Sequence, residues 1–167
     1  MPETGLGLLS AMITPAVLIS ACGTLIFSTS TRLARIVDRV RALTHLMEQI
    51  FAGEVRDFPE ERRQQMDLQL GMYAERAHLV QRSLTAFYVA LGIFVATTMA
   101  IGVQAFVPRL AFLPSLLGIA GILELFRGSM LLIRETRVSL KSVTAEMAFT
   151  LRLGELYQKR GKPSASD

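Results

Sequence analysis

The sequence predicts an all-α membrane protein: three transmembrane helices with long cytoplasmic helical extensions, namely an antiparallel hairpin and a C-terminal helix. Three observations lead to this class. Three apolar stretches contain no charged residue, the charged segments beside them carry apolar residues at helical spacing, and Arg and Lys gather on one side of the stretches. A helix needs roughly 20 apolar residues to cross a hydrocarbon core of about 30 Å.

The three apolar stretches are Leu6–Ser28, Leu84–Val107 and Leu110–Leu123. The first two are long enough to span a bilayer as they stand. The third reaches that length only if its helix continues through Glu124 and Arg127 to about Ile133. With 51% hydrophobic residues and a mean hydropathy of +0.40, the chain is also more apolar than most soluble domains of its size.

The distribution of basic residues predicts the orientation. Nine Arg separate the first two spans and seven Lys or Arg follow the third, whereas the connection between the second and third spans holds only Arg109. By the positive-inside rule, the N-terminus lies outside and both long charged segments lie in the cytoplasm with the C-terminus. The N-terminal Met-Pro-Glu-Thr has no positive residue, so we expect no cleaved signal peptide.

These features divide the chain into four parts. They are an N-terminal transmembrane helix at 1–30, a cytoplasmic helical hairpin at 31–83, the second and third transmembrane helices at 84–133, and a cytoplasmic C-terminal helix and tail at 134–167. No helix breaker separates Arg82 from Leu84, so we expect the second hairpin arm and the second span to form one continuous helix. Val107, Pro108 and Arg109 are expected to form the outer turn.

The hairpin prediction rests on two apolar seams with gaps that alternate between three and four residues, the spacing of a coiled coil. The seams are Leu33, Ile36, Val40, Leu43, Met47 and Ile50 in the first arm and Met66, Leu70, Tyr73, Ala77, Val80, Leu84 and Phe87 in the second. Gly53 offers a helix stop and Pro59 a restart. Matched lengths and a short connection therefore predict two antiparallel arms.

Two further packing predictions concern later parts of the chain. In the second span Gly92, Ala96 and Ala100 recur every four residues, a row that lets another helix approach closely. The C-terminal arm is amphipathic. Its spacing predicts that Leu140, Val143, Met147 and Leu151 are buried and that Arg134, Glu135, Arg137 and Lys141 face water.

The first candidate site is a polar stripe on the first span. On a helical wheel its hydroxyl residues fall within one arc about 120° wide, and charged residues continue the arc beyond the membrane. The stripe is Ser10, Thr14, Ser20, Thr24, Ser28, Thr31, Arg35, Asp38 and Arg39. In one interpretation it lines a water-filled pore. In the other, Ser and Thr bond the carbonyls four residues earlier and the stripe allows close helix packing.

The second candidate site is an intramembrane ion pair between Glu124 and Arg127 on the third span. Ionisable groups within a membrane are expensive unless they are paired or wetted, so they are functional candidates. Their spacing of three residues allows them to pair with each other. In the alternative interpretation, Arg127 extends to the membrane interface and Glu124 is its structural partner.

Signatures of catalysis and metal binding are missing from the sequence. It contains no glycine-rich phosphate loop, no HExxH motif and no nucleophile elbow. The single Cys22 excludes an intrachain disulfide and a site of several cysteines. Acidic residues alternate with the Arg of the hairpin, which argues against nucleic-acid binding. We therefore expect no enzyme, no cofactor, no metal and no nucleic-acid partner.

Two segments carry a resemblance to a known family. Residues 14–23 (TPAVLISACG) and 31–41 (TRLARIVDRVR) resemble an uncharacterised bacterial family of multi-pass membrane proteins, domain of unknown function 2721. The specific resemblance covers about the first quarter of the chain, and the layout of spans extends it over most of the rest. It implies a small protein of the bacterial cytoplasmic (inner) membrane and transfers no activity and no catalytic residue.

Function follows from the polar stripe and the apolar seams. Three spans make a thin bundle in membrane lipid, so we predict a cyclic homo-oligomer. One hypothesis is an ion or small-solute channel lined by the first transmembrane helix. The alternative is a membrane scaffold or regulatory module whose cytoplasmic helical stalk docks a protein partner. A transporter with a titrating Glu124 is a third hypothesis.

Overall fold

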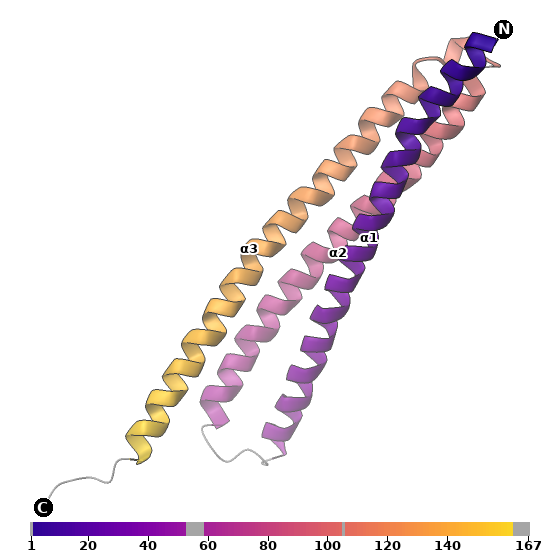
Figure 1. Cartoon of the computed structure of the whole chain (residues 1–167). Coiled ribbons are helices and arrows are strands. Elements are labelled where there is room, and N and C mark those ends of the chain that lie inside the picture. Colours follow the sequence, from indigo (N-terminus) through magenta and orange to yellow (C-terminus); the bar gives the residue numbers. More distant parts are fainter. Residues whose placement is uncertain (1, 53–58, 105, 162–167) are drawn as a thin grey trace, which may run out of the picture.

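The computed structural model describes residues 2–52, 59–104 and 106–161 (Figure 1). Its elements are α1 (Pro2–Phe51), α2 (Pro59–Gln104), a 3-10 turn η1 (Pro108–Leu110) and α3 (Leu113–Gly161). The described residues contain no strand, and each of the three long helices is apolar enough over part of its length to cross a membrane. The predicted all-α class with three membrane-spanning helices is confirmed.

The helix α2 lies between the other two. It packs against α1 on one side and α3 on the other, whereas α1 and α3 scarcely touch each other. Figure 1 shows that all three run along the same long axis and that α3 diverges from the α1–α2 pair towards its C-terminal end. Two pockets lined by residues of all three helices lie between α1 and α3 over α2, and we call this space the trough.

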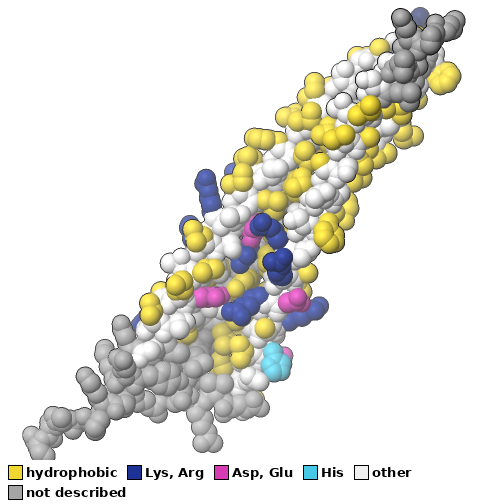
Figure 2. All heavy atoms as spheres, viewed as in Figure 1, with side chains coloured by type: hydrophobic (Ala, Val, Ile, Leu, Met, Phe, Trp, Pro, Cys, Tyr) yellow, Lys and Arg dark blue, Asp and Glu magenta, His cyan; other side chains and the backbone are white. Residues whose placement is uncertain are grey.

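Apolar and charged side chains separate along this axis. On the face shown in Figure 2, hydrophobic side chains dominate the described part of the half nearest the N-terminus, and most Lys, Arg, Asp and Glu side chains lie from the middle of the molecule onward. We call residues 10–28, 84–104 and 113–133 the apolar half, and residues 29–52, 59–83 and 134–161 the charged half. Because every helix crosses from one half into the other without a break, packing in the apolar half sets the rotation of the helix in the charged half.

The predicted hairpin seam is observed between α1 and α2 over residues 33–43 and 66–80, whereas Phe87, which was predicted to continue it, packs on Gly128 of α3. Its buried residues are Ile36, Leu43, Tyr73 and Val80, with Leu33, Val40, Met66, Leu70 and Ala77 packed around them. Burial of one such aliphatic side chain contributes about 1.5–3 kcal/mol, so this cluster holds the arms together. The α2 helix begins at Pro59 and continues into the apolar half, as predicted. The stop expected at Gly53 lies outside the described residues.

Two glycines of α3 set the packing of α2 against α3. Phe94 and Phe87 of α2 are buried, and each lies over one of these glycines. A Cβ atom at Gly121 would lie 2.6 Å from the Phe94 ring, and one at Gly128 would lie 2.6 Å from the Phe87 ring. The Ser83 hydroxyl also donates a buried hydrogen bond of 2.7 Å to the Gly128 carbonyl. These contacts fix both the distance and the rotation of α3.

The small-residue row predicted on α2 is only partly used. Ala100 is buried, but Gly92 is exposed and nothing lies within 4 Å of the position of a Cβ there. The close approach between helices instead takes place at Gly121 and Gly128. A glycine opposite a phenylalanine ring lets the helix backbone contact the ring. Two membrane helices can therefore pack closely there, as they do along a row of small residues.

The predicted burial of the C-terminal arm is wrong. Leu140, Val143, Met147 and Leu151 are exposed, with Leu140 at 69% and Leu151 at 72%, whereas Glu135 and Ser142 are buried. The helical repeat explains this. Gly121 and Gly128 turn one face of α3 towards α2, and seven-residue steps carry that face on to Glu135 and Ser142. Amphipathicity within the arm alone predicted that the opposite face of α3, which carries Leu140 and Met147, is buried.

Candidate functional site

A buried carboxylate marks the place where the three helices meet in the charged half. Glu135 of α3 is only 2% exposed, although it lies just beyond the apolar half. The rotation set by Gly128 points its side chain into the trough, over α2 and towards α1. An isolated carboxylate in this position is strongly unfavourable, so it must be paired.

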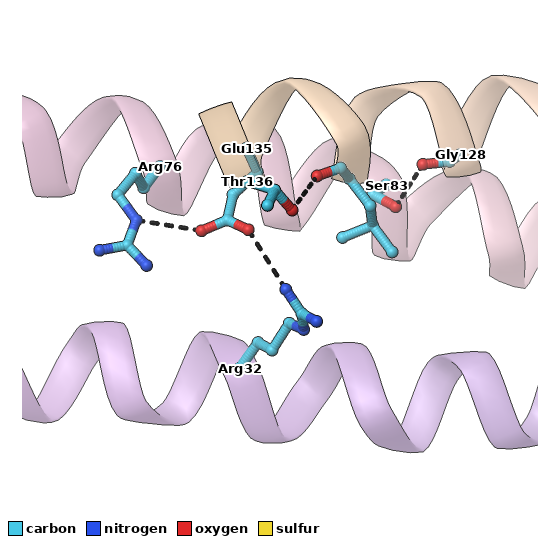
Figure 3. A network of polar contacts seen from close by, with 7 residues as sticks. Arg32, Arg76, Ser83, Gly128, Glu135 and Thr136 are labelled. Carbon is cyan, nitrogen blue, oxygen red and sulfur yellow. Dashed lines mark hydrogen bonds and ion pairs between the residues drawn. The ribbon is translucent and has the colours of Figure 1, made fainter. Parts of the chain in front are cut away.

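Two arginines from two other helices pair with Glu135 (Figure 3). Arg76 of α2 donates from Nε to Oε1 at 3.0 Å, and Arg32 of α1 approaches Oε2 from Nη1 at 3.5 Å. The Arg76 guanidinium also lies over the Tyr73 ring, 5.4 Å from its centroid. Glu135 therefore holds one arginine from each neighbouring helix in a fixed position. The amphipathic pattern of the C-terminal arm predicted that Glu135 faces water, and this prediction is wrong.

A second polar contact bridges α1 and α3 further along the charged half. Arg39 of α1 lies 3.6 Å from Glu146 of α3, and the Tyr73 hydroxyl donates to the other oxygen of Glu146 at 2.9 Å. Hydrogen bonding to Tyr73 and the nearby Glu146 carboxylate raise the pKa of Arg39. The two bridges link helices that otherwise scarcely touch.

An open cavity of about 640 Å³ lies between α1 and α3, and we call it the arginine cavity. Its charged lining residues are Arg32, Arg35, Arg39, Arg76 and Glu135; hydroxyl groups of Ser28, Thr31, Tyr73, Thr136 and Ser139 and the apolar Phe27 and Ile36 complete it. Figure 2 shows the cluster of basic side chains at the middle of the molecule. Among the described residues, Arg35 has no ion-pair partner.

The polar stripe of α1 lies on an exposed face of that helix. All nine of its residues, from Ser10 to Arg39, are exposed in the single chain. Four of them, Ser28, Thr31, Arg35 and Arg39, line the arginine cavity. Asp38 points elsewhere and lies 3.9 Å from Arg41. Thr24 and Thr31 bond the carbonyls four residues earlier, at 3.2 and 3.0 Å, as the packing interpretation requires of them.

A second, smaller cavity of about 420 Å³ opens in the apolar half near the N-terminal end of α1. Thr14 of the stripe lines it, together with Thr97, Gln104 and Ser115 from the other helices. Between the two cavities lies an apolar cluster in which Cys22, Ala90 and Phe94 are buried and Leu18, Ile19, Leu91 and Leu125 pack around them. We call this cluster the seal, because it separates the two cavities within one chain.

Glu124 and Arg127 form an ion pair on α3, with 2.8 Å between Arg127 Nε and Glu124 Oε2. Neither residue lines the arginine cavity. The structure therefore brings together the cavity end of the polar stripe and Glu135, and it leaves the Glu124–Arg127 pair apart from them.

Four residues that line the cavity and make its polar contacts were not predicted as site residues: Arg32, Tyr73, Arg76 and Glu135. Tyr73 was assigned to the hairpin seam, which its ring confirms, but its hydroxyl reaches Glu146 on α3. The sequence does contain a pattern that predicts the burial of Glu135. Gly121, Gly128 and Glu135 are spaced by seven residues on one helix, so a contact face defined by two glycines predicts a buried carboxylate at the third step.

Three long helices that are apolar enough to cross a membrane, joined end to end, define this chain as a multi-pass all-α membrane protein. Residues 12–145 match the family described as Protein of unknown function (DUF2721). Because the match covers most of the chain, the protein belongs to this family, and the resemblance seen in segments 14–23 and 31–41 is confirmed. No curated protein and no solved structure matches the sequence.

Proposed function

We propose that this protein is a homo-oligomeric channel of the inner membrane whose pore is lined by the polar face of α1 and favours anions. The N-terminus lies outside and the charged half lies in the cytoplasm. One observation carries the proposal: the hydroxyl stripe of α1 stays exposed through the apolar half and leads directly into the arginine cavity.

A single chain cannot enclose such a path. The seal closes the trough between the outer cavity and the arginine cavity. Ser20 and Thr24, which lie at the level of the seal, are exposed on α1 and line neither cavity. Water that passes the seal along the stripe must therefore be enclosed by a neighbouring chain. Most residues of each span are unburied in the single chain, which leaves surface for such a neighbour.

The charge at the inner end of the stripe supports anion preference. Four guanidinium groups line the arginine cavity, and Glu135 is the carboxylate among its lining residues. Basic side chains at a pore mouth attract anions and repel cations. Hydroxyl groups along the rest of the path can replace part of the hydration shell of an anion without binding it tightly.

Ion flux through the purified protein in liposomes tests this function. We expect chloride to pass at least about ten times faster than potassium, and we expect a Thr24→Leu variant to lose most of the flux because an apolar constriction dewets a narrow pore. Ala16→Leu is the matched control. Ala16 is exposed on another face of α1, so this variant keeps the flux within about twofold.

Two results would contradict the channel. One is the absence of chloride, potassium and small-solute flux from protein that native mass spectrometry shows to be oligomeric. The other is a lone protomer in mild detergent and in lipid, because a single chain has no enclosed path.

A scaffold remains the second candidate because of the exposed apolar face on the C-terminal arm of α3. Leu140, Val143, Met147 and Leu151 form this face, and in the proposed orientation it lies in the cytoplasm. A docked helix of a protein partner would cover it. Wild-type protein that gives no ion flux but crosslinks to a cytoplasmic partner, which a Leu140→Asp/Met147→Asp variant loses, would favour the scaffold over the channel.

A further inference from the structure

We propose that the arginine cavity is a binding site for a phosphate group, carried either by an anionic phospholipid or by a soluble phosphate compound. This inference goes beyond ion conduction and does not depend on it. Arg35 and Arg39 make the principal contacts from α1, and Arg32 and Arg76 supply further positive charge from the cavity wall.

The charge of the cavity selects an anion. Four guanidinium groups line it, Glu135 neutralises one of them, and Glu146 lies near Arg39. Positive charge therefore remains in excess after both carboxylates are counted. Arg35 has no ion-pair partner among the described residues, so its guanidinium donors are available to a ligand. A metal cation would be repelled from the same position.

The arrangement of donors suits a phosphate better than a monatomic anion. A guanidinium presents paired N–H groups in a planar fork that matches two oxygens of a phosphate. Arg35 and Arg39 are four residues apart, so they project from neighbouring turns on one face of α1. The hydroxyls of Ser28 and Ser139 lie in the walls of the same cavity, from α1 and α3, and can donate to the remaining oxygens.

Contacts between side chains hold three of the four arginines of the arginine cavity in place. Glu135 is buried and fixes Arg32 and Arg76, while Glu146 and Tyr73 position Arg39. Arginines that are already held in place lose less conformational entropy when a ligand binds. This preorganisation distinguishes the cavity from the exposed basic residues elsewhere on the charged half, such as Arg137.

The position of the cavity fits a phosphate at the membrane surface. Arg32 follows directly on the apolar half of α1, and the exposed Phe27 forms the end of the cavity nearest that half. A phospholipid whose acyl chains lie beside Phe27 would place its phosphate among Arg32, Arg35 and Arg39. Basic pockets between transmembrane helices at this level recognise anionic headgroups. A cavity of about 640 Å³ also accommodates a soluble phosphate ester.

Binding to the full-length protein in nanodiscs tests the site and identifies the source of the phosphate. In the first arm, native mass spectrometry counts phosphatidylglycerol molecules retained from nanodiscs that mix phosphatidylglycerol with phosphatidylcholine. In the second, calorimetry measures inorganic phosphate and glycerol phosphate binding to protein in phosphatidylcholine nanodiscs at constant ionic strength. Retention of phosphatidylglycerol alone assigns a lipid ligand, and binding of the soluble compounds assigns a soluble one.

Variants connect binding to the cavity. We expect Arg35→Gln to weaken binding in the responding arm at least about tenfold. Arg35→Lys, which keeps the charge and loses the fork, has an intermediate effect. Arg137→Gln is the control, because it removes one exposed arginine of α3 outside the cavity and should change binding less than about twofold. Thermal unfolding confirms that each variant folds. Arg35 is exposed, so we expect its replacement to leave the fold intact.

Two outcomes would overturn the proposal. One is the absence of binding in both arms with folded wild-type protein. The other is an equal loss in Arg35→Gln and Arg137→Gln, which would show attraction to net charge rather than a site. Chloride flux measured on the same preparations is a separate result, so failure of the phosphate site and failure of the channel can be told apart.

Discussion

Replacing Glu135 with leucine is expected to destabilise the folded protein by about 3–5 kcal/mol. The carboxylate is 2% exposed and holds Arg76 at 3.0 Å and Arg32 at 3.5 Å. Its removal leaves the guanidinium of Arg76, which is itself largely buried, without its counter-charge in the middle of the three helices. Removing one partner of a buried ion pair is costly because the other charge stays buried and unpaired. Removing every charge of the group costs much less.

The comparison of variants separates charge from packing. Glu135→Gln keeps the shape and one acceptor, so it should lose less stability than Glu135→Leu. The triple variant Glu135→Leu/Arg32→Leu/Arg76→Leu removes every charge of the group and should recover much of the loss. Glu75→Leu, at an exposed position of α2, is the control and should change stability by less than about 0.5 kcal/mol.

Unfolding in mild detergent, followed by far-UV circular dichroism during titration with a denaturing detergent, measures these differences. A Glu135→Leu variant as stable as wild type would contradict the assignment of Glu135 as the charge that joins the three helices. A triple variant less stable than Glu135→Leu would contradict the explanation through unpaired arginines.

Replacing Gly128 with leucine is expected to cost about 3 kcal/mol or more, because four carbon atoms must fit where the structure has no room for one. A Cβ atom at this position would lie 2.6 Å from the ring of Phe87 and 3.2 Å from the Cβ of Ala86. Phe87 is fully buried, so its ring has no free space into which to move. The helices α2 and α3 must separate instead, and the Ser83–Gly128 hydrogen bond is then lost.

Gly118 provides a matched control on the same helix, because nothing lies within 4 Å of a Cβ there. Gly118→Leu should be neutral or should stabilise the helix by up to about 1 kcal/mol, since glycine is a poor helix former. The double variant Gly128→Leu/Phe87→Ala should lose less than the sum of its single variants, as residues in contact do. Additive losses would contradict direct packing of Phe87 on Gly128.

The sequence alone predicted the architecture well, because long-range order in this molecule follows from local repeats. Leu33 to Leu43 of α1 pack against Met66 to Val80 of α2 because apolar residues at alternating gaps of three and four define one face of each helix. The continuity of α2 followed from the absence of a breaker between Arg82 and Leu84. Each of these predictions needs only the pattern within one segment.

The arginine cavity was harder to predict because it depends on the rotation of α3 relative to α2. Within residues 134–151, burial of Leu140 and exposure of Glu135 follow from amphipathicity, and the structure reverses both. Two glycines in the apolar half decide the rotation, because Gly121 and Gly128 lie directly against the buried rings of Phe94 and Phe87. The cavity end of the polar stripe was predicted, but its partners on α2 and α3 were not.

The proposed channel requires that the polar stripe of α1 faces water within the assembled protein. Substituted cysteines test it most directly, in a Cys22→Ala background that removes the single native thiol. Cysteines placed at Thr14, Ser20, Thr24 and Ser28 are compared with cysteines at Ala16 and Gly23, which are exposed on another face of α1. The readout is the rate of labelling by a membrane-impermeant thiol reagent in liposomes.

We predict that the four stripe positions react at least about ten times faster than Ala16→Cys and Gly23→Cys, because a thiol in contact with water ionises and a thiol in lipid does not. Equal and slow labelling at all six positions would show that the stripe is covered by lipid or by another helix, and would contradict the channel.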